Sequence, residues 1–289
     1  MQQAQDPTSA PWRGGPWGER ARCLLCPNPS PMTLEGTNTW ILAEPGSQEV
    51  VVVDPGPLDE GHLGAVLADV QGRGARVALT LLTHHHADHA ESAARFGELT
   101  GAPVRAVGSG HDDLAEGELL RVAGLEILVV RTPGHTLDSV SFLLPAEQVL
   151  LTGDTVLGRG TTVVAHPDGQ LAAYLASLER LARLTGSGQV SSLAPGHGPV
   201  VPDAEGVVQF YLQHRRERLE QVREAAAAIQ RDGDGGREGS GGGDDNDEGD
   251  LADAVVRSVY ADVPHEVWPA ARLSVLAQLT YLGLADGKQ

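Results

Sequence analysis

Residues 83–89 read Thr-His-His-His-Ala-Asp-His and carry more chemical information than any other stretch of this chain. The segment before them, 76–82, has the aliphatic composition of a buried strand, and the segment after them, 90–96, has a helix-forming composition. The cluster is therefore predicted to lie on a loop that joins a strand to a helix. Loops in such positions commonly carry functional side chains.

Four side chains of this loop have metal-binding groups in a pattern that fits two neighbouring ligand sets. His84 and His86, two residues apart, can point the same way, and Asp88 and His89 follow where the chain turns into the helix. Neutral imidazole and carboxylate suit zinc, iron or manganese, and the cluster has no cysteine to favour a closed structural site. A solvated His-rich tract or a purification tag is the alternative, but a tag lies at a chain end and this cluster is internal.

Three further candidate ligands, His135, Asp154 and His197, each follow an apolar segment and stand beside a glycine. Taken singly, Asp154 fits a turn or a helix cap, and each histidine fits a solvated loop. Taken together, three strand ends that each deliver a metal-competent group indicate a site built jointly by those ends.

In chain order, the motifs THHHADH, TPGHT, GDT and PGHG resemble the successive metal motifs of the metallo-β-lactamase superfamily, and Asp54 in VVVVDPGP resembles its first motif. The resemblance runs from about Gly36 to about Pro199. It implies an α+β fold, the αββα sandwich, and two divalent metal ions, with zinc as first choice and iron or manganese as alternatives. By this resemblance His84, His86 and His135 bind one metal, Asp88, His89 and His197 bind the second, and Asp154 bridges the two.

Two such metals predict a hydrolase. A water that bridges them loses a proton near neutral pH and becomes a hydroxide nucleophile, while the metals polarise the oxygen of the bond under attack. We assign catalytic roles to Asp88, which can also accept or pass on a proton, and to Asp154. Asp54 is expected to orient a ligand histidine through its ring N–H, although a turn-forming role before Pro55-Gly56 fits it equally.

Composition divides the chain into segments. Residues 231–250 hold eight acids against two arginines and many glycines, a composition too polar to order itself. The C-terminal helical patterns resemble the winged-helix-like region of the β-lactamase-like endoribonuclease branch, which some bacterial hydrolases and fungal polyketide thioesterases share. The predicted organisation is a flexible N-terminus at 1–20, a catalytic domain at 21–202, a long amphipathic helix at 203–230, an acidic disordered linker at 231–250 and a winged-helix-like subdomain at 251–289.

Three residues outside the metal motifs are candidate substrate contacts. Asn38 stands in Gly36-Thr-Asn-Thr39, a segment that leads towards the site in that branch, but an edge-strand role fits it equally. His214 and Arg215 lie on the predicted long helix, where they meet a substrate phosphate or carboxylate if they face the cleft. On the outer face they are solvated charges or structural groups.

The chain has 289 residues, a formal net charge of −18 and 41% hydrophobic residues, enough for a substantial core. No apolar run approaches the roughly 20 residues that cross a bilayer, and the N-terminus has no secretory signal pattern, so we expect a cytoplasmic protein without a membrane partner. The cysteine pair Cys23 and Cys26 has no second pair, which favours two reduced, partly buried thiols.

Three functions compete. The nearest resemblance is to the endoribonuclease branch, which implies phosphodiester cleavage in single-stranded RNA, but the acidic composition opposes nucleic-acid binding and excludes double-stranded DNA as an expected partner. The alternative is a thioesterase or other acyl hydrolase of the hydroxyacylglutathione hydrolase or polyketide thioesterase kind, acting on a small ester or thioester. A non-catalytic metal-binding scaffold is the third reading, and the complete ligand set disfavours it.

Overall fold

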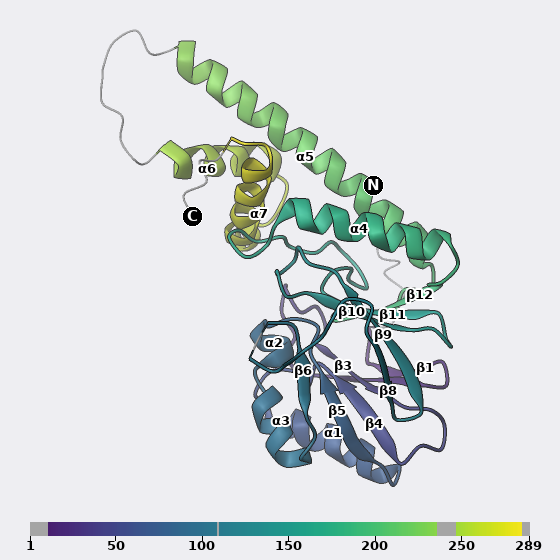
Figure 1. Ribbon diagram of the computed structural model, residues 1–289. Helices are drawn as coiled ribbons and strands as arrows, with labels where there is room; N and C mark the ends of the chain where they lie inside the picture. The colour runs from purple at the N-terminus through teal and green to yellow at the C-terminus, as the bar shows by residue number, and fades with distance from the viewer. Residues whose placement is uncertain (1–10, 109, 236–246, 285–289) are drawn as a thin grey trace.

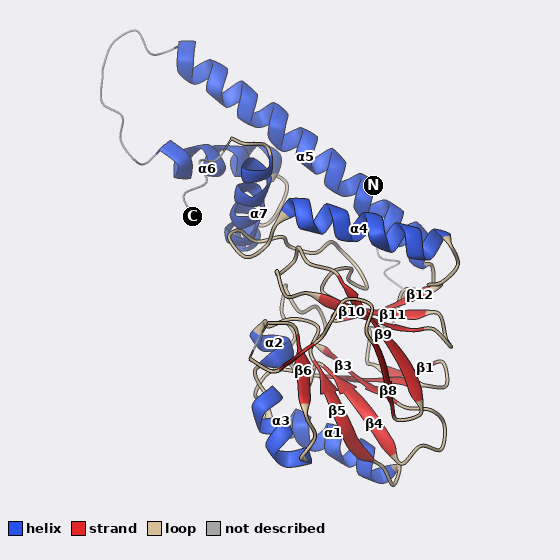
Figure 2. Ribbon diagram, in the orientation of Figure 1, coloured by secondary structure: helices blue, strands red, loops and turns tan. Residues whose placement is uncertain are grey.

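A computed structural model of the protein describes residues 11–108, 110–235 and 247–284. They form two packed sheets with helices on both outer faces, as Figures 1 and 2 show. The predicted αββα sandwich is therefore confirmed. The first sheet runs in the order β1 (Gly15–Trp17), β2 (Ala21–Leu25), β3 (Asn38–Leu42), β4 (Glu49–Val53), β5 (Arg76–Leu81), β6 (Val104–Ala106) and β7 (Asp112–Asp113). The second runs β12 (Ser192–Pro195), β11 (Val149–Gly153), β10 (Val140–Leu144), β9 (Leu125–Arg131) and β8 (Leu119–Val122).

Strand β4 shows why the first sheet has near-continuous apolar runs. Val51 and Val53 pack into the core between the sheets, whereas Val50 and Val52 pack against the outer helices α1 (Glu60–Gly72) and α3 (Ala93–Thr100). Successive side chains of a strand point to opposite faces, so a strand covered on both faces must be apolar throughout.

The second sheet repeats this arrangement. Phe142 of β10 and Leu151 of β11 face the first sheet, and Leu150 faces the helices α4 (Leu171–Gly186) and α5 (Ala204–Gly235). Figure 1 shows α4 and the N-terminal part of α5 on the outer side of the second sheet, with the rest of α5 extending towards α6.

Strand direction brings the predicted ligand loops to one edge. Strands β4, β5 and β6 pair in parallel, as do β11 and β12. The carboxyl ends of parallel neighbours lie at the same edge, so the loops that leave them meet. The short helix α2 (Ala87–Ala90) begins within the histidine cluster, as expected for a strand-to-helix loop.

The N-terminal part differs from the predicted flexible segment 1–20. Residues 1–10 lie outside the described residues, but β1 pairs antiparallel with β2, and Trp12 and Trp17 pack against the core between the sheets. Backbone pairing and burial of two indoles offset the entropy of ordering this segment, a gain that its sequence pattern did not reveal.

The C-terminal part contains α6 (Asp247–Val259), the short 3-10 helix η1 (His265–Val267) and α7 (Trp268–Tyr281). Apolar side chains of α5, including Val222 and Ala226, pack with α6 and α7 in one cluster. The predicted long helix extends five residues further than expected, to Gly235, because adding a residue to an existing helix is far easier than starting one. Residues 236–246 of the predicted linker lie outside the described residues.

Among the described residues, no helix is both long and apolar enough to cross a membrane. The cytoplasmic location stays a prediction.

The packing of the core between the sheets predicts how much stability a core mutation removes. Phe142 is fully buried there, so Phe142→Ala should lower the free energy of unfolding by about 3–5 kcal/mol through lost burial and the cavity left behind. Leu99→Ala is the matched control, because Leu99 is 40% exposed and its replacement should cost less than about 0.5 kcal/mol. Urea unfolding of both variants checks this; equal losses would contradict the assigned core.

Candidate metal centre

All seven predicted ligands meet at one edge of the sandwich. His84 and His86 follow β5, Asp88 and His89 lie on α2, and the other three follow strands of the second sheet. Those three are His135 after β9, Asp154 after β11 and His197 after β12. Both sheets therefore contribute, and any ion bound here joins them.

The first ligand set is His84, His86 and His135. The Nδ1 atom of His86 lies 3.1 Å from Nε2 of His84 and 3.1 Å from Nε2 of His135. With Zn–N bonds of about 2.0–2.1 Å, neighbouring ligands of a tetrahedral ion lie roughly 3.3 Å apart. The spacing of these nitrogens therefore fits a shared zinc-sized ion.

The second set is Asp88, His89 and His197. The Nε2 atom of His197 lies 3.1 Å from Oδ2 of Asp88 and 3.2 Å from Nε2 of His89. These three residues and the first set are two of the groupings whose ligand atoms all lie within 4.8 Å of one another.

Asp154 lies between the two sets. Its Oδ1 is 3.5 Å from Nε2 of His89, and its Oδ2 is 3.3 Å from Nε2 of His197 and 3.8 Å from Nε2 of His135. One carboxylate thus reaches histidines of both sets, which is the position that a bridging ligand requires.

In three of the ligand histidines, the ring nitrogen that faces away from the cluster, Nδ1, has a hydrogen-bond acceptor. These acceptors define the tautomer of each neutral ring. Nδ1 of His135 donates to the carbonyl of Val163 (2.7 Å), and Nδ1 of His197 donates to that of Gly36 (3.2 Å). Nδ1 of His89 lies 2.8 Å from Oδ2 of Asp54. Because these ring N–H groups point outward, the Nε2 of each ring, once neutral, turns a lone pair towards the cluster, as in known zinc sites.

Asp54 supports the ligand histidine His89, and its own backbone is in a strained conformation. Its φ of 53° is left-handed, a conformation that aspartate tolerates better than most residues. Its carboxylate accepts hydrogen bonds from the backbone N–H (2.8 Å) and hydroxyl (2.7 Å) of Thr83 as well as from His89. This geometry is what the predicted orienting role of Asp54 needs.

Protonation differs between the two sets. Burial lowers the pKa of His86 to about 4, and lowers that of His84 well below its usual value, so both of these histidines of the first set are neutral at pH 7. Burial also opposes the charge on His89 and His197, but neighbouring carboxylates outweigh it. Asp154 above all raises the pKa of His197 to about 9 and that of His89 well above its usual range.

The donor groups fit metal cations on three observations. They are imidazole nitrogens and carboxylate oxygens, the ligands of zinc and similar ions. Oδ1 of Asp154 is buried without a hydrogen-bond partner. A Cβ atom at Gly196 would lie 2.5 Å from that oxygen and 2.7 Å from Cε1 of His89, so only glycine leaves the room.

His85, between two ligands in sequence, turns to the rim. It is about half-exposed, and its Nδ1 lies 3.0 Å from Oδ1 of Asp138. His85, His86 and Asp168 form a further grouping with ligand atoms within 4.8 Å, but His86 already belongs to the first set through its Nδ1.

The structure corrects the expected substrate contact at Asn38. This side chain is fully buried, its amide donates to the carbonyls of Pro195 (2.9 Å) and Gly198 (2.8 Å), and its oxygen accepts from the indole of Trp12. Its hydrogen bonds bracket His197, so Asn38 shapes the loop of a ligand and has no group left for a substrate.

Arg215 is likewise buried away from substrate, whereas a substrate contact at His214 stays a prediction. Arg215 is only 6% exposed and donates to the carbonyl of Thr162. His214 stacks on Phe210, with 5.8 Å between ring centroids, and burial lowers its pKa to about 4. Neither residue belongs to a ligand grouping among the described residues.

Sequence reasoning missed the groups that support the ligands. Thr83 and the carbonyls of Gly36 and Val163 hold histidine or aspartate side chains, and Gly196 supplies space. Only Gly196 left a signal, as the glycine before His197. Backbone carbonyls leave none, because every residue has one.

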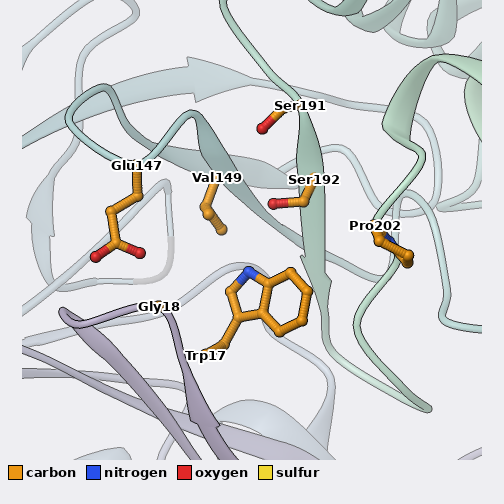
Figure 3. Close-up of a pocket in the computed structure, with 7 residues that line it drawn as sticks. All are labelled: Trp17, Gly18, Glu147, Val149, Ser191, Ser192 and Pro202. Atoms are coloured by element: carbon orange, nitrogen blue, oxygen red, sulfur yellow. The ribbon is translucent and has the colours of Figure 1, made fainter.

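A separate hollow of about 330 Å³ lies at the other ends of β11 and β12 (Figure 3). It contains none of the seven ligands, and its carboxylate, Glu147, already accepts hydrogen bonds from Glu19 and Arg20. The candidate site is therefore the cluster of seven ligand residues and not this hollow. The hollow is lined by Trp17, Gly18, Glu147, Val149, Ser191, Ser192 and Pro202.

Comparison with known families identifies both parts of the chain. The model of the metallo-beta-lactamase superfamily matches residues 32–126 and 108–187, and that of the beta-lactamase associated winged helix domain matches residues 252–287. The predicted winged-helix-like C-terminal part is thereby confirmed.

Individual proteins agree with these matches. Beta-lactamase-like protein 2 homolog of Drosophila melanogaster is 32% identical over 280 residues, covering 90% of this chain and 86% of that protein. Atrochrysone carboxyl ACP thioesterase of Aspergillus fumigatus is 34% identical over 218 residues, covering 72% of this chain and 65% of that protein. The crystal structure of a metallo-beta-lactamase family protein from Thermus thermophilus has the same fold, with a TM-score of 0.69, 24% identity and coverage of 91% of this chain and 93% of that one.

Because ligands from both sheets meet here, bound metal should stabilise the whole sandwich. Removing it with a chelator should lower the melting temperature by on the order of 10 °C, and added zinc should restore it. His86→Ala should lower both the zinc content and the melting temperature. His111→Ala is the control, since His111 is in no ligand grouping of the described residues, and should change neither; equal behaviour of the two variants would contradict the first ligand set.

The raised pKa of His197 predicts competition between zinc and protons. Its Nε2 must lose a proton before it binds a cation, so zinc affinity should rise by about tenfold per pH unit and per displaced proton as the pH increases towards about 9. Chelator competition at pH 6.5, 7.5 and 8.5 measures this. An affinity that stays constant over the range would show that His197 does not bind the ion.

Proposed function

Because the chain belongs to the metallo-beta-lactamase superfamily and is a hydrolase, we propose that it is a two-metal thioesterase that cleaves the bond between an acyl group and a thiol carrier. Zinc is the proposed metal, since nitrogen and carboxylate donors dominate the cluster. The proposed ligands are His84, His86 and His135 for the first ion, Asp88, His89 and His197 for the second, and Asp154 for both.

When bound, the metals supply Lewis acidity for the thioester carbonyl and lower the pKa of water. The chain's own part is to hold and move protons. Of the three carboxylates, Asp88 exposes 30% of its side chain, against 12% for Asp154 and 2% for Asp54. Asp88 is therefore the carboxylate placed to accept a proton from water and release it to solvent.

A thiol nucleophile is disfavoured. Cys23 and Cys26 are buried free thiols. Burial raises the pKa of Cys26 to about 12 and also raises that of Cys23, so both stay protonated at neutral pH. A protonated thiol is a poor nucleophile. The attack is thus left to water at the metal cluster.

The leaving group also favours a thioester. Burial acts to raise the pKa of Asp88, but the hydrogen bond from His197 and the charge of His89 outweigh it and lower the pKa, so Asp88 is ionised at neutral pH and keeps no proton in reserve for a leaving group. A thiolate, whose parent thiol has a pKa near 8.5, can leave without a proton. An alkoxide is far more basic and needs one, so this site suits thioesters better than phosphodiesters.

Surface charge weighs against RNA. The net charge is −18, and binding to a polyanion draws on free cationic groups that displace counterions. Many surface arginines are instead paired with carboxylates. Examples are Arg20 with Glu44, Arg95 with Glu60, Arg105 with Glu118, Arg159 with Glu35 and Arg180 with Glu116.

The observation that carries the substrate class is the Aspergillus fumigatus relative, whose name states that it is an acyl carrier protein thioesterase. The relatives reported above do not single out the RNA-cleaving branch that the sequence alone put first.

The test compares a model acyl thioester with a fluorescent single-stranded RNA, using zinc-loaded protein. We expect thioester hydrolysis that chelator abolishes, that zinc restores and that Asp154→Asn reduces by at least about a hundredfold, because the residue between both ligand sets loses its charge. His111→Ala should retain full activity. Chelator-sensitive RNA cleavage without thioester turnover would overturn the proposal in favour of the nuclease.

A further inference from the structure

The segment 154–163, between β11 and α4, carries two groups that the metal cluster uses. Asp154 opens it with the carboxylate that lies between the ligand sets. Near its end, the carbonyl of Val163 accepts the Nδ1–H of His135 at 2.7 Å. The segment contains no helix or strand, so its shape must be fixed by other contacts.

Part of that shape comes from within the segment and from tyrosines of the outer helices. The hydroxyl of Thr162 donates to the carbonyl of Asp154 at 2.7 Å. Tyr174 of α4 donates to the carbonyl of Thr155 at 2.7 Å, and Tyr211 of α5 accepts from the backbone N–H of Leu157 at 3.0 Å. These bonds hold the first half of the segment and tie its end to its beginning.

The end of the segment is held by Arg215 of α5. Its guanidinium donates to the carbonyl of Thr162 and lies over the ring of Tyr174, 5.0 Å from the centroid. The residue is 6% exposed, and within the described parts of the chain it forms no ion pair with a carboxylate. A buried arginine without an acid partner is unusual, and a charge-assisted hydrogen bond to a carbonyl is stronger than a neutral one.

We infer that Arg215 is a positioning residue for the metal centre. By fixing Thr162, it holds the neighbouring Val163 carbonyl against His135 and, through the Thr162 hydroxyl, the backbone of Asp154. Without the guanidinium the segment relaxes, His135 loses the acceptor that defines its tautomer, and Asp154 loses its alignment. The inference rests on the proposed metal site but adds a residue that touches neither metal ligand nor substrate.

The test uses Arg215→Met, which keeps the length of the side chain without its charge or donors. Partners that orient a metal-bound histidine typically contribute about 10–100-fold in metal affinity. We expect zinc affinity, measured by chelator competition, to fall within that range, and the visible spectrum of the cobalt-substituted protein to shift. kcat should fall by about tenfold or more while KM changes by less than about twofold.

Two further variants separate positioning from general stability. Arg216→Met alters the next residue of the same helix, which is exposed and lies 3.7 Å from Glu179, and it should match the parent in affinity, spectrum and kcat. Arg215→Lys keeps the charge and one donor direction and should recover part of each property. If Arg215→Met does not fold, Arg215→Gln, whose amide is too short to replace the guanidinium, is judged by the same criteria.

The outcomes are distinct. A parent protein that binds zinc, together with an Arg215→Met variant of unchanged affinity and cobalt spectrum, overturns the inference even if the variant melts at a lower temperature. A parent protein that binds no zinc at the cluster overturns the proposed function, and the inference with it.

Discussion

The structure depends on an electrostatic constraint at one edge of the two sheets. Histidine nitrogens converge there with the carboxylates of Asp54, Asp88 and Asp154. The Nε2 atoms of His89 and His197 lie only 3.2 Å apart. Such groups repel one another unless positive charge stands between them, so the site needs protons or metal cations. The outward hydrogen bonds of the ligand histidines, the left-handed Asp54 and the space at Gly196 all serve to hold this arrangement.

The fold and the clustering of the seven candidate ligands at one edge could be predicted because their signals are local. Alternating apolar segments that end in short motifs specify strands whose loops meet, and His84, Asp154 and His197 each stand next to such a strand end. The supporting residues could not be predicted, because their surroundings arise from distant segments. Asn38 bonds to Pro195, 157 residues away, and Arg215 bonds to Thr162, 53 residues away. Asn38 and Arg215 were predicted to contact substrate because they are polar, but both side chains are buried and bonded within the protein.

The same distinction applies to the choice between substrates. The ligand motifs are common to enzymes that cleave thioesters and phosphodiesters, so the nature of the metal site leaves that choice open. Two features of the surroundings support the proposed thioesterase: Asp88 is ionised and holds no proton for a basic leaving group, and surface arginines are paired with carboxylates. The acidic net charge agrees with the substrate class that the relative's name supplies, whereas the metal chemistry is common to both classes.

Helix α5 has a consequence for how this chain can be altered. Arg215 faces the segment beside Asp154, and Val222 and Ala226, seven and eleven positions later, face α6 and α7 along the same stripe of the helix. One inserted or deleted residue between Arg215 and Val222 rotates one end by about 100° relative to the other. Recombination with a relative, or an engineered exchange of the winged-helix part, must therefore preserve the helical phase as well as the sequence on each side.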